Sequence, residues 1–338
     1  MANIQSWAAH GAKKKLIPYK FDPGLIGAEE VEVAVEHCGV CHSDLSMINN
    51  DWGYSRYPLV PGHEVVGRVV AVGSRVQGAK VGDRVGVGWT AASCMHCRLC
   101  LSGAQHLCPD AQGTIVGHAG GFAERVRAHW AWTIPLPAAL EAATAGPLLC
   151  GGITVFNPLV LYSVSPAARV GVVGIGGLGH LALKFARAWG CEVTAFTSSD
   201  SKRDEARALG AHHVASSRDK KSMAALAGTL DLLIVTVNVP LEWDTLMATL
   251  APRGRMHIAG AVLEPIPVRS FDLIGAERVI SGSPTGSPVD IARMLDFAAR
   301  HGIAPQVERF PMREVNEALE HLASGKARYR IVLDNDFC

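Results

Sequence analysis

The chain has 338 residues, a formal net charge of +1, and a composition that is 49% hydrophobic and 19% charged. This length predicts about two domains, each large enough for a core of its own. The balanced charge leaves no basic surface for neutralising phosphates, so we predict no nucleic-acid partner.

The first segment, MANIQSWAAHGAKKKLIPYK, has lysines near its start but no apolar run of signal-peptide length behind them. We therefore expect a cytoplasmic protein. In a reducing compartment, the nine cysteines are more consistent with metal binding than with a set of disulfides.

Short runs rich in β-branched residues extend from Val31 to Trp132 and are broken by glycine and proline. The runs are VEVAVEHCG, VVGRVVAVG, VGDRVGVG and GGFAERVRAHWAWTIP. This pattern predicts an irregular, mostly β domain.

Four cysteines are concentrated in one segment of this domain, CMHCRLCLSGAQHLC. They are Cys94, Cys97, Cys100 and Cys108. Four thiolates at such short spacing match a closed structural zinc site, although an iron–sulfur cluster can use similar spacing. A nucleic-acid finger is a third alternative, but Arg98 and two histidines are the only basic side chains in the segment. We predict a structural zinc ion.

Residues 142–168 carry no charge, which raises the question of a membrane span. Pro147, Pro158 and Pro166 interrupt the stretch, together with several glycines. A lipid-exposed helix does not tolerate so many interruptions. We therefore predict a buried part of a protein core and no membrane partner.

From Arg169 onwards, apolar strands alternate with helical stretches, which is typical of βαβ units on a parallel sheet. The segment GIGGLG lies between the strand RVGVVG and the helix HLALKFARA, and it fits the dinucleotide-binding pattern G-x-G-x-x-G. Glycines there permit a tight turn and a close approach of the backbone to a pyrophosphate at the helix N-terminus. The predicted cofactor-binding residues of this loop are Gly174, Gly176, Gly177, Leu178 and Gly179.

The end of the next strand indicates which dinucleotide is bound, because an acidic residue there would hold the free ribose of NAD. This chain instead has Ser198 and Ser199, followed by Lys202 and Arg203. Hydroxyls and cations favour a 2′-phosphate, so we predict NADP(H). The alternative is that the two cations only form the solvated face of the following helix.

Helical patterns return in SPVDIARMLDFAARHG and REVNEALEHLASG before a last strand, RYRIVLD. We expect this tail to rejoin the β domain, which leaves the α/β unit inserted. The predicted domains are residues 1–148 with 288–338, and residues 149–287.

A second set of possible metal ligands consists of Cys41 in CGVCHSDL, His63 in YPLVPGHEVVG, and Cys150 in PLLCGGITVF. A lone buried cysteine is usually a small core residue. Two thiolates and one imidazole together form the ligand set of a catalytic zinc with an open fourth position.

These motifs, together with GGFAE, GIGGLGH, RYRIVLD and the four-cysteine segment, cover nearly the whole chain. The chain resembles the zinc-dependent medium-chain alcohol dehydrogenases, in particular the cinnamyl alcohol dehydrogenase branch and its bacterial NADP-dependent aldehyde reductases. The resemblance implies an α/β fold class, with a GroES-like, mostly β catalytic domain and an inserted Rossmann domain with a doubly wound parallel sheet. It also implies a homodimer or homotetramer.

The resemblance assigns roles to individual residues. Cys41, His63 and Cys150 would hold the catalytic zinc, and Glu64 would be an alternative ligand or a carboxylate that tunes the field. Asp44 would orient His63, and Ser43 would hydrogen-bond to the substrate oxygen. The remaining implied residues are His42 and Arg330 near the cofactor pyrophosphate, Thr154 beside the nicotinamide, and Trp52 and Trp89 in the substrate pocket.

The expected activity is reversible hydride transfer between NADP(H) and a primary alcohol or aldehyde, aromatic or of medium chain length. Two other functions are a zinc-independent quinone or enone reductase, which Cys41, His63 and Cys150 disfavour, and an NADP-binding zinc protein that senses redox state. The chain departs from its relatives at Ser46, where many carry histidine, and in residues 109–119, a loop that is shorter than usual.

Overall fold

The computed structural model describes residues 3–337 and divides into two compact units. The first unit runs to Ile153 and resumes at Thr285, and the second runs from Thr154 to Pro284. The second unit is thus inserted into the first. The changeover positions lie a few residues from the predicted boundaries, so that Cys150 falls in the first unit, not in the inserted one.

A seven-stranded sheet forms the frame of the first unit, with the order β16–β17–β3–β4–β5–β9 and with β8 also paired to β3. The long strand β3 contacts three neighbours and carries the chain directly to Cys41. The strands of this sheet are β3 (Glu30–Val40), β4 (Val65–Val72), β5 (Arg84–Val87), β8 (Arg125–His129), β9 (Ile134–Pro135), β16 (Val307–Pro311) and β17 (Arg330–Asp334).

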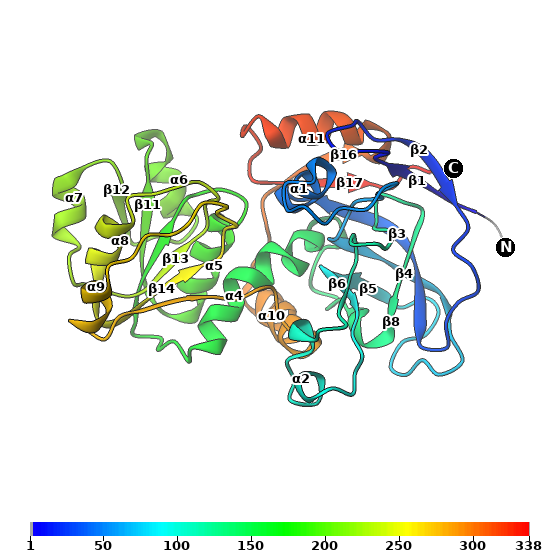
Figure 1. Cartoon of the computed structure of the whole chain (residues 1–338), viewed down its shortest axis with the longest axis horizontal. Helices are drawn as coiled ribbons and strands as arrows, with labels where there is room; N and C mark the ends of the chain where they lie inside the picture. The colour runs from blue at the N-terminus through cyan, green and yellow to red at the C-terminus, as the bar shows by residue number, and fades with distance from the viewer. Residues whose placement is uncertain (1–2, 338) are drawn as a thin grey trace. The chain divides into compact units, whose positions relative to one another are not determined.

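Two small ribbons and several helices complete this unit (Figure 1). Helix α4 (Gly151–Leu161) begins in the first unit and continues into the second. The ribbons are β1 (Ile4–Ala8) with β2 (Ile17–Phe21), and β6 (Thr90–Ala92) with β7 (Gln112–Gly113). The other helices are α1 (His42–Asn49), α2 (Arg98–Leu101), α3 (Ala142–Ala145), α10 (Pro288–His301) and α11 (Val315–Ala323).

Helix α10 illustrates how the sequence fixes an element. Ser287 accepts a hydrogen bond from the backbone amide of Asp290, and the carboxylate of Asp290 accepts one from the amide of Ser287, so the two residues form a capping box. Pro288 occupies the first helical position, and Gly302 ends the helix with a φ of 62°. The helix therefore begins and ends where the segment SPVDIARMLDFAARHG predicts.

The second unit contains a six-stranded parallel sheet with the order β12–β11–β10–β13–β14–β15. Along the chain, β11 and β12 are added on one side of β10, and β13 to β15 are added on its other side. The carboxyl end of β10 is therefore a topological switch point, where ligands bind in such sheets. The strands are β10 (Arg169–Val173), β11 (Glu192–Thr197), β12 (His213–Ser216), β13 (Leu230–Val235), β14 (Leu250–Ile258) and β15 (Val279–Gly282). The helices are α5 (Gly179–Trp189), α6 (Arg203–Ala208), α7 (Lys220–Ala225), α8 (Trp243–Thr249) and α9 (Ser270–Ile274).

The uncharged stretch is largely buried, as predicted from its prolines and glycines. Leu149, Ile153, Phe156 and Leu159 are at most 1% exposed. Among the described residues, no single helix is long and apolar enough to cross a membrane. Residues 142–149 and 151–161 reach that length only as a pair bent by 53°.

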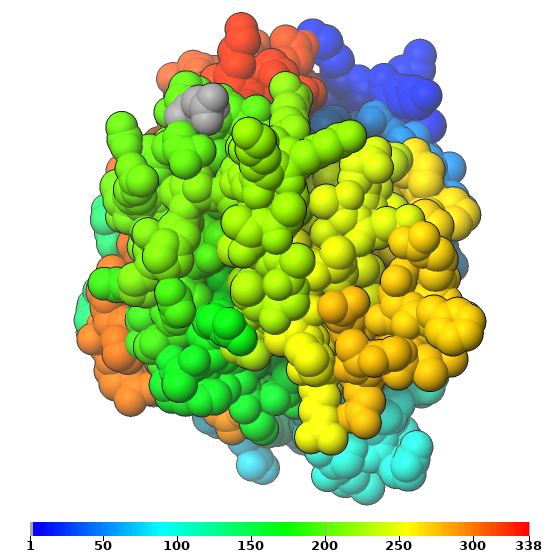
Figure 2. All heavy atoms as spheres, turned by 90° about the vertical axis from the view of Figure 1, so that its left-hand side faces the viewer, coloured from blue at the N-terminus to red at the C-terminus, as the bar shows by residue number. Residues whose placement is uncertain are grey.

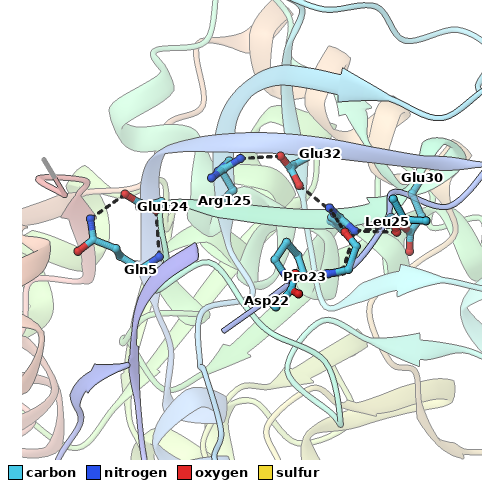
Figure 3. A network of polar contacts seen from close by, with 10 residues as sticks. Gln5, Asp22, Pro23, Leu25, Glu30, Glu32, Glu124 and Arg125 are labelled. Atoms are coloured by element: carbon cyan, nitrogen blue, oxygen red, sulfur yellow. Dashed lines mark hydrogen bonds and ion pairs between the residues drawn. The ribbon is translucent and has the colours of Figure 1, made fainter. Parts of the chain in front are cut away.

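A buried carboxylate connects the edge of the main sheet to the segment after β2. Glu32, which is 6% exposed, accepts hydrogen bonds from Arg125 at 3.0 Å and from Arg127 at 2.9 Å. Arg127 also donates to the carbonyls of Pro23 and Leu25. Figure 3 shows Glu32 with Arg125 on one side, and Pro23 and Leu25 on the other. The network thereby holds β8 against β3, the strand that leads to the candidate site.

Candidate active site and metal centres

Cys41 is fixed by the start of helix α1. It is the N-cap residue of this helix, and its backbone amide donates to Asp44 Oδ2 at 2.9 Å. A side-chain acceptor three residues into a helix satisfies an amide that the helix itself leaves unpaired. The local sequence CHSD therefore holds the Cys41 backbone rigidly.

The second oxygen of Asp44 orients His63. Oδ1 accepts from the Gly62 amide at 2.8 Å and contacts His63 Nδ1 at 2.9 Å. Asp44 and His63 are both fully buried. A carboxylate on Nδ1 keeps the proton on that nitrogen and leaves the Nε2 lone pair for a metal.

Cys41, His63, Glu64 and Cys150 form a buried cluster whose ligand atoms all lie within 4.8 Å of one another. His63 Nε2 lies 3.3 Å from Cys150 Sγ. A nitrogen and a sulfur on the same tetrahedral zinc ion would be about 3.5 Å apart, since Zn–N is about 2.0 Å and Zn–S about 2.3 Å. The donor set and the spacing therefore fit a zinc ion.

The electrostatics of this cluster favour a thiolate. The hydrogen bond from Cys150 and, after the opposing effect of burial, the charge of Arg330 lower the pKa of Cys41 well below its ordinary value. The thiolate is the form of cysteine that binds metals.

Glu64 pairs with Arg330, a contact that the sequence does not predict. Arg330 Nη2 donates to Glu64 Oε1, whereas Glu64 Oε2 is buried and has no hydrogen-bond partner among the described residues. Burial raises the pKa of Glu64 to about 7, against the opposing charge of Arg330. This oxygen is a buried, unsatisfied acceptor beside two thiols and an imidazole, and a bound cation would satisfy it.

Aromatic rings lie on one side of His63. The Trp89 ring is 5.1 Å from the imidazole and nearly perpendicular to it, and the Trp52 ring is 5.9 Å from Trp89. Tyr54, which sequence reasoning missed, stacks on Trp52 at 5.9 Å. The two predicted pocket residues thus lie beside the cluster, and a third ring extends the apolar wall.

The four-cysteine segment brings its sulfur atoms together in a second possible metal site. Cys94 Sγ lies 3.8 Å from Cys100 Sγ and 3.5 Å from Cys108 Sγ, and Cys97 Sγ lies 3.8 Å from Cys108 Sγ. Four sulfurs at about 2.3 Å from a tetrahedral zinc would be about 3.8 Å apart. Backbone hydrogen bonds, first from His96, lower the pKa of Cys94 to about 6. All four thiols are free, so this segment fits a closed zinc site.

The loop between β10 and α5 has the shape of a dinucleotide cradle. Gly174 has a φ of +90°, and a Cβ on Gly179 would lie 1.8 Å from the Gly174 carbonyl oxygen. Gly176 faces open space with nothing within 4 Å of where its Cβ would be. These features match the turn, the helix packing and the close ligand approach that the three glycines of such a loop provide. Gly177 and Leu178 complete the loop.

The residues predicted to bind the 2′-phosphate on the cofactor ribose lie just after the end of β11. Lys202 Nζ donates to the carbonyl of Ile175 in the glycine loop at 3.1 Å. Arg203 donates to the carbonyl of Val214 at 3.0 Å. Ser198 is exposed, and Ser199 Oγ is 2.7 Å from Ser201 Oγ. One ammonium group is therefore next to the cradle.

The other predicted residues lie on helices α1 and α4. His42 is exposed, and Ser43 is half-buried with no hydrogen bond to its hydroxyl among the described residues. Ser46 is also half-buried. Thr154 is the first residue of the second unit and is half-buried.

Two protein-family models match the chain. The alcohol dehydrogenase GroES-like domain matches residues 27–138, and the zinc-binding dehydrogenase model matches residues 177–300. The chain therefore belongs to the zinc-binding alcohol dehydrogenase family and has the GroES-like plus Rossmann fold of the medium-chain dehydrogenases, as its motifs predict.

Individual relatives narrow the comparison. The chain is 55% identical to aldehyde reductase AdhA of a Synechocystis strain over 98% of this chain and 99% of that protein. It is 40% identical to aldehyde reductase YahK of Escherichia coli over 98% of each. The structure of the Sorghum bicolor cinnamyl alcohol dehydrogenase SbCAD4 matches with a TM-score of 0.94 at 40% identity, covering 98% of both chains. The protein is accordingly an oxidoreductase of the alcohol dehydrogenase and aldehyde reductase class.

A further solved structure bears on the cofactor. The cinnamyl alcohol dehydrogenase from Helicobacter pylori, described as complexed with NADP(H), matches with a TM-score of 0.90 at 28% identity and covers 98% of both chains.

Proposed function

We propose that this protein reduces aromatic and medium-chain aldehydes with NADPH. The observation that carries the proposal is the buried cluster of Cys41, His63 and Cys150 beside the Trp89 ring. A metal site with apolar aromatic walls suits a polarised carbonyl attached to a flat or extended apolar group.

Each residue of the cluster has a distinct task in this proposal. Zinc bound by Cys41, His63 and Cys150 would supply a Lewis acid, and the dinucleotide would supply the hydride. Asp44 positions the imidazole and the Cys41 backbone at once. Ser43 donates a hydrogen bond to the substrate oxygen and provides its proton. Glu64 and Arg330 balance charge within the buried site.

NADP(H) is proposed as the cofactor on the basis of the second unit. The glycine loop receives the pyrophosphate at the N-terminus of α5, with His42 and Arg330 as further pyrophosphate residues and Thr154 beside the nicotinamide. The 2′-phosphate is held by Ser198, Ser199, Lys202 and Arg203. The ammonium group of Lys202, at 3.1 Å from the loop carbonyl of Ile175, supports this assignment.

We further propose that the protein works in the cytoplasm and that, of the expected homodimer and homotetramer, it forms the homodimer. Reduced thiols in both cysteine clusters suit that compartment. The edge strand β15 and the exposed side chains of Phe271 and Ile274, at 83% and 72% exposure, favour a contact between two copies. Light scattering on the wild type and on Ile274→Asp would test this, with a dimer and a monomer as the expected results.

Steady-state kinetics test the proposed function. Cinnamaldehyde, hexanal and a quinone should be offered with NADPH and with NADH to the zinc-loaded protein. We expect turnover of both aldehydes and a higher kcat/KM with NADPH. Reduction of the quinone alone would contradict the assignment, and equal use of NADH would contradict the cofactor preference.

A further inference from the structure

A hollow of about 440 Å³ lies in the second unit, away from the glycine loop. Its lining includes residues just before β10 and near the start of β13, such as Ala168, Asp231 and Leu232. The glycine loop follows the carboxyl end of β10 instead. Because these strands are parallel, the hollow lies at the opposite edge of the sheet from the dinucleotide cradle. Figure 2 shows the surface of this unit, in green to orange.

The hollow contains an arginine whose hydrogen-bonding capacity is unused. The Arg255 guanidinium lies over the Tyr162 ring, 3.8 Å from its centroid. The Arg255 backbone belongs to strand β14, but among residues 3–337 no hydrogen bond or ion pair to the Arg255 guanidinium is present. Stacking on an aromatic ring fixes the plane of the guanidinium and leaves its N–H groups at the edge for a planar oxyanion.

The other charges of the hollow are already paired. Arg253 donates to Glu277 at 2.7 Å, and Arg169 lies 3.6 Å from Asp231. Burial, followed by the charge of Arg255, lowers the pKa of His257 to about 4, so this neighbour of Tyr162 is neutral at pH 7. These groups leave a single uncompensated positive charge, that of Arg255.

Backbone strain is concentrated at the same place. Ser163 and Arg253 both line the hollow and have φ angles of 49° and 65°, and Glu277, the partner of Arg253, has a φ of 52°. Non-glycine residues rarely adopt this conformation, and they cluster at ligand sites where the surrounding structure holds them.

We propose that this hollow binds a small organic monocarboxylate, with the carboxylate on the Arg255 guanidinium and its apolar part against Val164 and Leu232. One uncompensated cation matches a monoanion better than a phosphate dianion. The volume lies within the range of about 300–1,000 Å³ of small-molecule sites. The site is separate from the proposed active site and goes beyond the reductase function.

Isothermal titration of the zinc-loaded full chain with butyrate, butyramide and inorganic phosphate tests the proposal. We expect butyrate to bind at one site, and uncharged butyramide of the same shape to bind roughly tenfold more weakly or not at all. Phosphate binding more tightly than butyrate would overturn the carboxylate assignment. An absence of butyrate binding to the wild type would overturn the site altogether.

Variants locate the binding. Arg255→Gln should weaken butyrate binding roughly tenfold or more, because it removes a charge-assisted, bidentate contact. The matched control Arg253→Gln, whose guanidinium already has a partner, should change the affinity less than about threefold. Arg255→Lys keeps the charge but not the planar fork, and it should fall between the two.

The same variants distinguish binding of butyrate in the hollow from binding of butyrate at the catalytic metal. An affinity that is unchanged in both Arg255→Gln and Arg255→Lys would place butyrate elsewhere and refute the proposal. Aldehyde reduction without butyrate should be unaffected in both variants, which also shows that they fold.

Discussion

Replacement of Asp44 by asparagine tests whether a single buried carboxylate builds the proposed metal site. The carboxylate accepts three hydrogen bonds, from the Cys41 amide at 2.9 Å, from the Gly62 amide at 2.8 Å, and from His63 Nδ1 at 2.9 Å. Asparagine offers only one oxygen. Whichever way its amide turns, an N–H group faces at least one buried donor.

The magnitude follows from these contacts. Loss of one hydrogen bond to a charged group costs about 1.5–3 kcal/mol, and the facing donors add the penalty of an unsatisfied buried group. We therefore expect Asp44→Asn to lower the free energy of unfolding by about 3 kcal/mol. The affinity for zinc at this site should fall by about 10–100-fold, as it does when other carboxylates behind a ligating histidine are changed.

Two measurements are needed, because loss of stability alone would not identify the site. Urea unfolding gives the stability, and competition with a chromogenic chelator gives the zinc affinity. The control is Asp219→Asn, which changes an exposed N-cap of α7 that asparagine also serves well. Wild-type zinc affinity in Asp44→Asn would refute the role of Asp44, whatever the change in stability.

Three further predictions concern the rest of the chain. Cys97→Ser should lose one zinc per chain and unfold the four-cysteine segment, whereas Cys191→Ser, outside both clusters, should keep the full zinc content; elemental analysis decides, and an unchanged content in Cys97→Ser would argue against the structural zinc. Ser43→Ala should lose roughly 100-fold in kcat and Ser46→Ala little, because only Ser43 is placed in the proton path; comparable losses in both, with zinc retained, would make Ser46 a relay member. Burial first, and then a neighbouring arginine, lower the pKa of His257 from 6.5 to about 4. The unfolded chain therefore binds more protons between these values, and stability should fall as the pH drops from 6.5 to 4, by at most about 3 kcal/mol. His257→Gln should lack this part of the pH dependence in urea unfolding, and a variant with the wild-type pH dependence would contradict the assignment.

The fold could be predicted wherever local patterns are strong. The segment RVGVVGIGGLGHLALKFARAWG contains both the strand β10 and the helix α5, because glycine positions and apolar periodicity act together. Strand β14 was only partly predicted. Its uninterrupted strand-like pattern, RMHI, begins only at Arg255, whereas the strand begins at Leu250, because Pro252 and Gly254 argue against a strand in the sequence. A register shift between Leu230 and Leu232 on the neighbouring strand accommodates them.

The two metal sites could be predicted because cysteine and histidine are recognisable in the sequence as metal ligands. Spacing brings the four cysteines of one segment together, but it says nothing about contacts between distant segments. The pairing of Arg330 with Glu64 spans 266 positions and depends on two antiparallel pairings, of β17 with β3 and of β3 with β4, which Glu64 directly precedes. The ring of Tyr54 beside Trp52 leaves no signal in the sequence that separates it from any other loop tyrosine.

Zinc content and aldehyde turnover of Cys150→Ala, measured on the same preparation, test the central claim most directly. Because Cys150 belongs to the cluster beside Trp89 and not to the four-cysteine segment, we predict one zinc per chain instead of two, with reduction of cinnamaldehyde by NADPH abolished. Wild-type turnover in a variant that has lost this zinc would contradict the account.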